Sequence, residues 1–240
     1  MIKASIFIPC FIDQLYPQTG MNMVKVLRKA GVEVDYPEEQ TCCGQPAFNA
    51  GYRSQAKEVC NKFLKDFAGK EYIVIPSASC AGFIRNYYPQ LFDNSSLHNE
   101  VRSLQKRVFE FSEFMVNVLK VEDVGATLKT KAVYHDSCAA LRECHIKTEP
   151  RKLLAHVKDL ELAEMQNNET CCGFGGTFAV KYEPISAAMA DQKTGYAQDT
   201  GAKVIVSTDV SCLMHLEGYL RHRDMDMKTM HIADVLASGW

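Results

Sequence analysis

The sequence predicts an α/β protein made of two duplicated halves, each built from βαβ units around a parallel sheet. The first observation is a Thr-Cys-Cys-Gly motif that occurs twice, at residues 41–44 and 170–173. The second is that each motif lies between two short apolar stretches that end in a cysteine. The third is that longer stretches with helical periodicity separate the apolar ones, an alternation typical of parallel sheets.

Eight cysteines follow the same spacing in both halves. Each half has a single cysteine, then after about thirty residues a Cys-Cys-Gly triplet, then after about forty residues another cysteine. These residues are Cys10, Cys42, Cys43 and Cys80 in the first half and Cys138, Cys171, Cys172 and Cys212 in the second. Four cysteines repeated in register indicate an internal duplication.

Four stretches rich in β-branched or aromatic residues are predicted to be buried strands. Each ends at a cysteine of the repeat, and they span residues 4–10, 71–80, 131–138 and 202–212. Sites in open α/β sheets form beyond the carboxyl ends of the strands. We therefore expect the strand ends and the two Cys-Cys-Gly loops to converge into two pockets, one in each half. Gly44 and Gly173 would let the backbone turn tightly enough to aim both neighbouring sulfurs inward.

Three stretches are predicted to be helices. Residues 21–31 end in Gly31, which suits the position just beyond a helix. Residues 54–70 and 103–120 each carry one apolar stripe at helical spacing. The stripes are Ala56, Cys60, Phe63 and Phe67 in the first, and Leu104, Val108, Phe111, Met115 and Val118 in the second.

The boundary between the halves is expected in residues 121–130, a loop-like stretch with few large apolar residues. We place the first half at residues 1–125 and the second at residues 126–240. The two halves are expected to pack as pseudo-twofold relatives, with their cysteine-rich sites at the carboxyl ends of the strands.

Composition excludes several classes of function. The 240 residues are 47% hydrophobic and carry a formal net charge of −2, which fits a globular protein and argues against nucleic acid as a partner. The longest apolar runs are strand-sized, so no membrane span is expected. The N-terminus lacks the long apolar region of a signal peptide, which favours the cytoplasm. In that reducing compartment, ten cysteines indicate metal binding or catalysis and not a disulfide framework.

Thiolates bind zinc, Cu(I) or iron–sulfur clusters. Vicinal cysteines fit poorly around one zinc ion, whose ligands share a small tetrahedral sphere. An iron–sulfur cluster is larger, so neighbouring thiolates can bind different irons, and four cysteines per half match the ligand count of a four-iron cluster. The spacing therefore favours iron–sulfur, while zinc and metal-free thiol redox chemistry stay open.

The repeated Cys-xₙ-Cys-Cys-Gly-xₙ-Cys pattern resembles the cysteine-rich CCG domain found in heterodisulfide reductases and in glycolate oxidase iron–sulfur subunits. Blocks such as "VEVDYPEEQTCCGQPAFNAGY" and "TGAKVIVSTDVSCLMHL" are more similar still to the lactate utilization protein A family. The resemblance covers nearly the whole chain. It implies an iron–sulfur electron-transfer subunit of a bacterial complex that oxidises L-lactate to pyruvate, with the other subunits of that complex as partners.

The expected cofactors are up to two iron–sulfur clusters of the 4Fe-4S type, held by the eight repeated cysteines, with zinc open in one site or as a substitute. No nicotinamide fingerprint and no P-loop is found. We therefore expect a subunit of an oxidoreductase complex that relays electrons, and whether it is itself catalytic stays open. The alternatives are a thiol/disulfide redox subunit like heterodisulfide reductase, or a zinc-stabilised interaction subunit.

The chain departs from the heterodisulfide reductase pattern at three positions. Ser77 and Asp209 stand where that family ends each half in Cys-x-x-Cys, which leaves four cysteines per site, or a site completed by one of these oxygens. Ala139 stands where relatives have a histidine beside the cysteine, which excludes a histidine ligand next to Cys138.

Other residues near the repeat have plainer interpretations. Cys60 is predicted to be a core residue and Cys144 a bystander. His135 and His215 either tune or complete a site, or form structural hydrogen bonds. Asp136 and Asp209 stand at strand ends and can cap the helices that follow. Arg85 and Arg142 either are ordinary surface arginines or bind an anionic partner or substrate.

Overall fold

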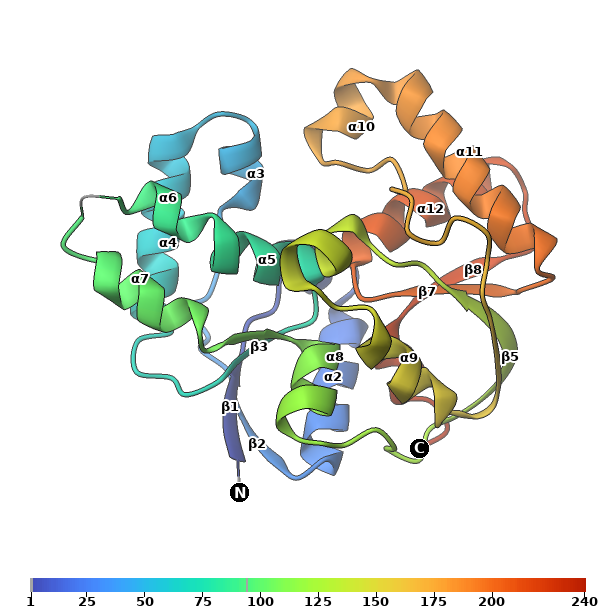
Figure 1. Cartoon of the computed structure of the whole chain (residues 1–240), viewed down its shortest axis with the longest axis horizontal. Helices are drawn as coiled ribbons and strands as arrows, with labels where there is room; N and C mark the ends of the chain where they lie inside the picture. The colour runs from blue at the N-terminus through green and yellow to red at the C-terminus, as the bar shows by residue number, and fades with distance from the viewer. Residues whose placement is uncertain (1, 94) are drawn as a thin grey trace.

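The computed structural model describes residues 2–93 and 95–240 and has two sheets of four parallel strands, one in each half of the chain (Figure 1). The first sheet has the order β2-β1-β3-β4 and the second the matching order β6-β5-β7-β8. The strands are β1 (Ile2–Ile6), β2 (Val32–Asp35), β3 (Ile73–Ile75), β4 (Val108–Glu110), β5 (Thr127–Tyr134), β6 (Lys158–Ala163), β7 (Val204–Ser207) and β8 (Lys228–His231). The predicted α/β class with duplicated parallel halves is confirmed.

The four predicted strands are the four central ones, β1, β3, β5 and β7. β3 and β7 are buried along their whole length, because helices cover both faces of a parallel sheet. The sequence does not predict the four edge strands. They are short and carry polar residues, as in "VEVD" of β2 and "KTMH" of β8, so no apolar run marks them.

Helices connect the strands in both halves. In the first half they are α1 (Cys10–Leu15), α2 (Pro17–Lys29), α3 (Gln45–Asn49), α4 (Arg53–Asp66), α5 (Ala78–Asn86), α6 (Tyr88–Leu91), α7 (His98–Gln105), α8 (Phe111–Glu113) and a π-helical turn at Phe114–Val118. In the second half they are a π-helical turn at Ala140–Cys144, then α9 (Thr148–Ala155), α10 (Thr177–Lys181), α11 (Glu183–Asp199), α12 (Val210–His222) and α13 (Ile232–Leu236).

Two of the three predicted helices are confirmed. α2 ends before Gly31, whose φ of 84° is the left-handed conformation expected there, and α4 buries its predicted stripe. The single helix predicted over residues 103–120 is wrong. Its stripe is largely buried, but residues Val108–Glu110 extend to pair with β3 and so interrupt the helix. The loop predicted at residues 121–130 is also too long, because β5 begins at Thr127.

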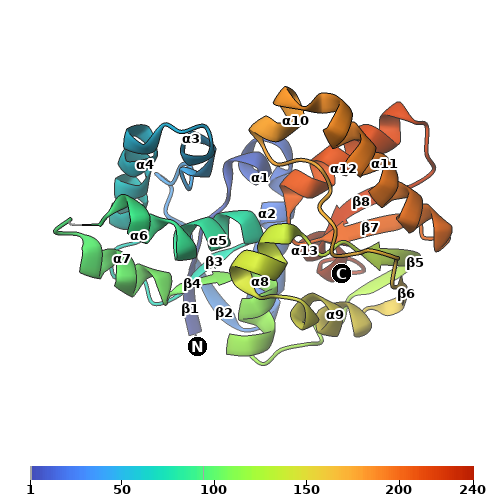
Figure 2. The same ribbon diagram turned by 45° about the horizontal axis from the view of Figure 1, so that its top comes forward.

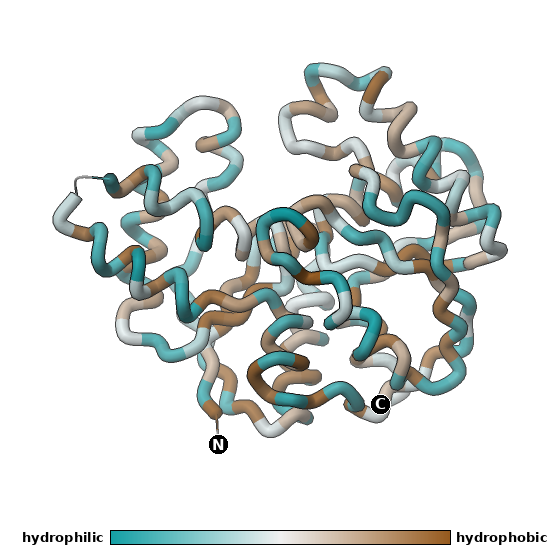
Figure 3. Tube along the Cα trace, viewed as in Figure 1, coloured by the Kyte–Doolittle hydropathy of each residue, from teal (hydrophilic) through white to brown (hydrophobic). Residues whose placement is uncertain are grey.

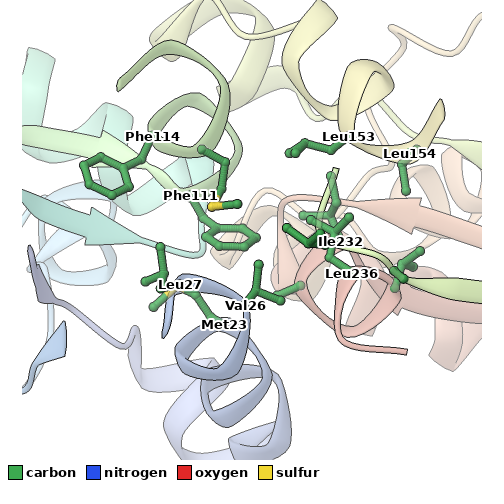
Figure 4. Packing of buried hydrophobic residues seen from close by; sticks show 14 of the residues in the cluster. Met23, Val26, Leu27, Phe111, Phe114, Leu153, Leu154, Ile232 and Leu236 are labelled. Carbon is green, nitrogen blue, oxygen red and sulfur yellow. The ribbon is translucent and has the colours of Figure 1, made fainter. Parts of the chain in front are cut away.

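One hydrophobic core is shared by both halves. Figure 4 shows Met23, Val26 and Leu27 of α2 facing Phe111 and, from the second half, Ile232 and Leu236 of α13. Two further clusters surround the sites, one around α4 and α5, which also includes Ala140, Cys144 and Ile146 of the second half, and the other around α11 and α12.

The elements that carry the Cys-Cys-Gly loops stand on the same side of the molecule. Figures 1 and 2 show α3 and α4 in the first half, and α10 and α11 in the second, projecting beyond the sheets in the same direction. Brown, apolar stretches in Figure 3 coincide with parts of the central strands. Across the described ranges 2–93 and 95–240, no helix has the length and apolarity needed to cross a membrane.

Candidate metal centres

The strand order places the repeated cysteines at the switch point of each sheet. β2 pairs with one edge of β1 and β3 with the other, so the chain reverses its direction of progress across the sheet at β1. Crevices form at the carboxyl ends of the strands at such a point. Cys10 begins the helix after β1, Cys80 lies in the helix after β3, and the Cys-Cys-Gly loop follows β2. Cys138, Cys212 and the second loop follow β5, β7 and β6 in the same way.

The sulfurs of each half lie in contact with one another. In the first half the Cys10 and Cys42 Sγ atoms are 4.0 Å apart, and those of Cys43 and Cys80 are 3.4 Å apart. The vicinal Cys42 and Cys43 also contact each other, so the four sulfurs form a row in the order Cys10, Cys42, Cys43 and Cys80.

The second half repeats this pattern, since Cys171 contacts Cys138 and Cys172 contacts Cys212. All ten cysteines of the chain are free thiols, so none of these contacts is a disulfide. The structure thus brings each predicted quartet together.

A glycine turn follows each vicinal pair. Gly44 and Gly173 have φ angles of 91° and 98°, which side chains rarely adopt. Their N–H groups donate to the Cys42 and Cys171 sulfurs over 3.4 Å in both cases. The turn thus aims a backbone donor at the first sulfur of each pair.

Each quartet stabilises one thiolate. Hydrogen bonds from Cys10 and Cys43 lower the pKa of Cys42 to about 3, and those from Cys138 and Cys172 lower the pKa of Cys171 to about 2. The thiols that donate these bonds have raised pKa values for the same reason. A metal that binds here must displace the remaining protons, so binding is expected to release protons.

The sites have a buried and a more accessible side. Cys43, Cys80, Cys172 and Cys212 are buried, whereas the other four ligand candidates are partly exposed. Phe11, next to Cys10, packs edge-on against Phe174, next to Gly173, with ring centroids 5.9 Å apart. This contact joins the loops of the two sites.

Ser77 and Asp209, which replace the fifth cysteine of the resembling family, bind each other across the two halves. The Asp209 carboxylate accepts hydrogen bonds from the Ser77 hydroxyl over 3.3 Å and from the Ser79 backbone N–H over 2.9 Å. The sequence predicts that Asp209 caps the helix after its own strand. It stands at the start of α12, but its side chain makes no bond to the backbone of that helix and instead binds the first turn of α5.

His135 lies under the second site. It is fully buried, and one of its ring nitrogens lies within 4.8 Å of both the Cys172 and the Cys212 Sγ atoms. His215 is half-buried and contacts Ser186 and the Phe174 ring at the rim of the same site.

The structure assigns structural roles to three of the other candidates. Cys60 is buried in the core, as predicted, and Cys144 of the second half is buried in the same cluster. Asp136 does not cap a helix; it is fully buried and accepts two bonds from Arg151, at 2.8 and 2.7 Å.

The two arginines proposed to bind an anion differ in their surroundings. Arg85 donates two hydrogen bonds to the Glu113 carboxylate, at 2.8 and 2.9 Å. Glu113 therefore occupies the N–H groups of the guanidinium that an anion would need. Arg142 is exposed.

One buried charge near the second site does not stand out in the sequence. Lys193 of α11 is 1% exposed and donates to the backbone carbonyls of Asn167 and Asn168 over 2.7 and 3.0 Å. A register comparison of the helices after the two Cys-Cys-Gly loops could have found it, because an apolar residue holds the matching place in the first half.

The donor set fits a thiophilic metal or cluster. Each site has four sulfurs, two buried and two partly exposed, with a backbone N–H donor beside them. Such sulfurs suit soft metals, whereas Ca²⁺ and Mg²⁺ prefer oxygen ligands. Because the four sulfurs of a site form a row, the arrangement suits a cluster with several metal atoms.

Comparison with known proteins agrees with this interpretation. The cysteine-rich domain family CCG matches the chain twice, at residues 4–85 and 132–217, and each match contains one quartet. Lactate utilization protein A of Bacillus subtilis (strain 168) is 44% identical over 238 residues, covering 99% of this chain and 100% of that protein. Lactate utilization protein A of Halalkalibacterium halodurans is 43% identical over 235 residues, covering 98% and 96%.

A solved structure shares the fold. The crystal structure of a hypothetical protein from Helicobacter pylori superimposes with a TM-score of 0.61 at 11% sequence identity. The match covers 99% of this chain and 49% of the other, so the chain spans about half the length of that protein.

Proposed function

The chain belongs to the cysteine-rich CCG domain family, among the lactate utilization A proteins, and from this premise we propose that it is the iron–sulfur electron-transfer subunit of a bacterial system that oxidises L-lactate to pyruvate. The two thiol quartets at the carboxyl ends of the central strands carry the proposal. The eight repeated cysteines are the proposed ligands, and residues 1–125 and 126–240 the two proposed units.

The pairing of sulfurs supports clusters over single ions. If both vicinal sulfurs bound one tetrahedral ion, they would face the same point. Instead the four sulfurs form a row, in which Cys42 contacts Cys10 on one side and Cys43 contacts Cys80 on the other. Four-iron clusters take four thiolates, one for each iron, which matches each quartet.

When bound, such clusters supply reversible one-electron transfer. Oxidation of lactate to pyruvate releases two electrons and two protons, so two sites in one chain can hold one electron each. The partner subunits are proposed to take lactate. The chain itself holds sulfur in a half-buried setting, with the N–H groups of Gly44 and Gly173 donating to it. Such hydrogen bonds favour the more negative, reduced state.

The accessible side of each site gives electrons a path to a partner. Cys10, Cys42, Cys138 and Cys171 are partly exposed, so a docked subunit can approach those ligands closely. Ten free cysteines suit the reducing cytoplasm, where we place the protein.

The test is anaerobic reconstitution followed by iron and sulfide analysis. We expect about eight irons per chain. Cys42→Ser should lose about half of the iron, because it removes a ligand of the first site only. Cys60→Ala is the matched control: it removes a cysteine of the same half that lies in the core, and should keep all the iron. Full iron in Cys42→Ser, or zinc in place of iron in the wild type, would refute the proposal.

One observation favours a second candidate function. The Cys42 thiolate is partly exposed, and the Cys10 sulfur lies 4.0 Å from it, as in a dithiol that exchanges with disulfides. A thiol–disulfide exchange assay on the metal-free subunit separates this candidate from electron transfer, because the latter requires bound iron.

A further inference from the structure

The two sites have different floors, although the duplication gives them the same cysteines. The floor of a site is defined here by two residues. One is the first residue after β1 or β5, and the other lies on the long helix α4 or α11, the second helix after the Cys-Cys-Gly loop. These residues are Phe7 and Phe63 in the first half and His135 and Lys193 in the second.

The backbone shows that Phe7 and His135 are equivalent. Each comes directly after the strand, β1 or β5, and each stands three residues before the first cysteine of its quartet. The Phe7 N–H donates to the Val74 carbonyl over 3.0 Å, and the His135 N–H donates to the Val206 carbonyl over 2.8 Å. Val74 lies in β3 and Val206 in β7, the matching strands.

The glycine turns show that Phe63 and Lys193 are equivalent. A Cβ on Gly44 would meet the Ala56 carbonyl, and a Cβ on Gly173 would meet the Ser186 carbonyl, so these two helix positions correspond. Phe63 follows Ala56 by seven residues on α4, and Lys193 follows Ser186 by seven on α11.

The first floor is apolar and closed. The Phe7 and Phe63 rings are 0% and 2% exposed and meet edge to face with centroids 5.0 Å apart. Neither side chain has a nitrogen, oxygen or sulfur atom that could bind a metal held by Cys43 and Cys80.

The second floor is polar, and the His135 ring in it lacks a hydrogen-bond partner in the described part of the chain. Among the described residues, neither ring nitrogen of His135 has a hydrogen-bond partner, although the ring is fully buried. An unpaired buried nitrogen costs free energy unless something binds it. The second-site sulfurs of Cys172 and Cys212 lie within 4.8 Å of a ring nitrogen, so a metal held by them would be within its reach.

The charge states suit these positions. The fully buried setting of His135 favours the neutral imidazole, which is the form that binds metal. Burial lowers the pKa of Lys193 to about 8, so its ammonium is still largely protonated at pH 7.

We propose that His135 binds one iron of the second site in addition to the four cysteines, so that this iron has five ligands, and that Lys193 makes this site the one with the higher reduction potential. The proposal rests on the proposed iron–sulfur function. A buried positive charge stabilises the extra negative charge of a reduced cluster. The first floor, made of Phe7 and Phe63, has no such charge. Electrons would therefore pass from the first site to the second.

The test separates the two sites by emptying one at a time. Cys42→Ser leaves the second site loaded, and Cys171→Ser leaves the first. In the reduced Cys42→Ser protein, pulsed EPR should detect nitrogen coupling of the size given by a bound imidazole, which His135→Phe should abolish. The Cys171→Ser protein has phenylalanine at the matching place and should lack that coupling.

The potential is tested by redox titration in the same backgrounds. The midpoint should be higher for the second site than for the first. Lys193→Met, which keeps an unbranched side chain without charge, should lower the second midpoint and leave the first unchanged. If His135→Phe fails to fold, His135→Gln replaces it, and the coupling should disappear likewise.

The outcomes are distinguishable. A wild type without iron would refute the proposed function, and this inference with it. Two loaded sites without imidazole coupling would refute the ligand role of His135 alone. A second midpoint that does not respond to Lys193→Met, or that lies below the first, would refute the role of Lys193 while leaving the electron-transfer function intact.

Discussion

At the scale of single residues, Glu110 couples stability to pH. Its carboxylate accepts bonds from the backbone N–H groups of Ser112 and Glu113 over 2.8 and 3.2 Å, but its Oε1 atom has no partner among the described residues. Burial raises its pKa from 4.5 to about 8. Between these values the folded protein holds a proton that the unfolded chain has released, so stability falls as pH rises.

We therefore predict that Glu110→Gln removes this pH dependence. The amide is neutral at every pH and keeps an oxygen for the helix cap. The free energy of unfolding of the variant, relative to wild type, should increase by up to about 4 kcal/mol between pH 4.5 and 8. Denaturant titrations at several pH values measure this difference. A difference that stays constant with pH would show that Glu110 is ionised throughout.

Residue types identified the ligand candidates, but not the contacts made by the residues around them. Cysteine is rare and its chemistry narrow, so a repeated spacing was enough to predict both quartets, and the structure brings them together. Asp209 and Lys193 are common residue types whose roles depend on distant partners. Asp209 binds Ser79, 130 positions away, and no local pattern encodes that contact.

At the scale of elements, the two glycine turns give a matched pair of substitutions. Alanine at Gly44 must adopt a φ of 91°, and its Cβ would lie 3.2 Å from the Ala56 carbonyl oxygen. Alanine at Gly173 must adopt a φ of 98°, and its Cβ would lie 2.6 Å from the Ser186 carbonyl oxygen and 2.9 Å from Met189.

We predict that Gly173→Ala is the more damaging of the two. Gly44→Ala should cost about 1–2 kcal/mol for the left-handed backbone. Gly173→Ala should cost on the order of 3 kcal/mol or more, because a backbone oxygen must also move. Urea unfolding of the two metal-free variants measures both values, and equal losses would contradict the prediction. The iron retained by each variant reports separately on the sulfur that the turn orients.

The sequence predicts central strands better than edges for a physical reason. β1, β3, β5 and β7 have neighbours on both sides, and the short cores of β3 and β7 are wholly buried. The edge strands pair on one side only, and polar residues are tolerated there. The apolar spacing around Val108–Glu110 suits a helix as well as a strand, and pairing with β3 decides between them.

At the scale of the whole molecule, the halves do not have separate cores. α2 of the first half and α13 of the second pack together, and the Thr19 and Asn22 side chains each donate to Asp234 over 2.9 Å. Asp209 and the Phe11–Phe174 contact join the halves again near the sites. The duplication visible in the sequence therefore predicts two sheets and two sites, but does not reveal how much core they share.

This shared core predicts that one substitution in the second half weakens both sheets. Leu236 is 1% exposed and belongs to the cluster that contains Met23 and Leu27 of α2. Leu236→Ala should lower the free energy of unfolding by about 2–5 kcal/mol, the usual cost of a cavity at a buried leucine. Hydrogen exchange should then accelerate equally at the most protected amides of β1 and β5, because both open through the same global unfolding. If only the amides of the second sheet respond, the halves unfold independently, and the boundary at residues 125 and 126 separates two folding units that merely touch.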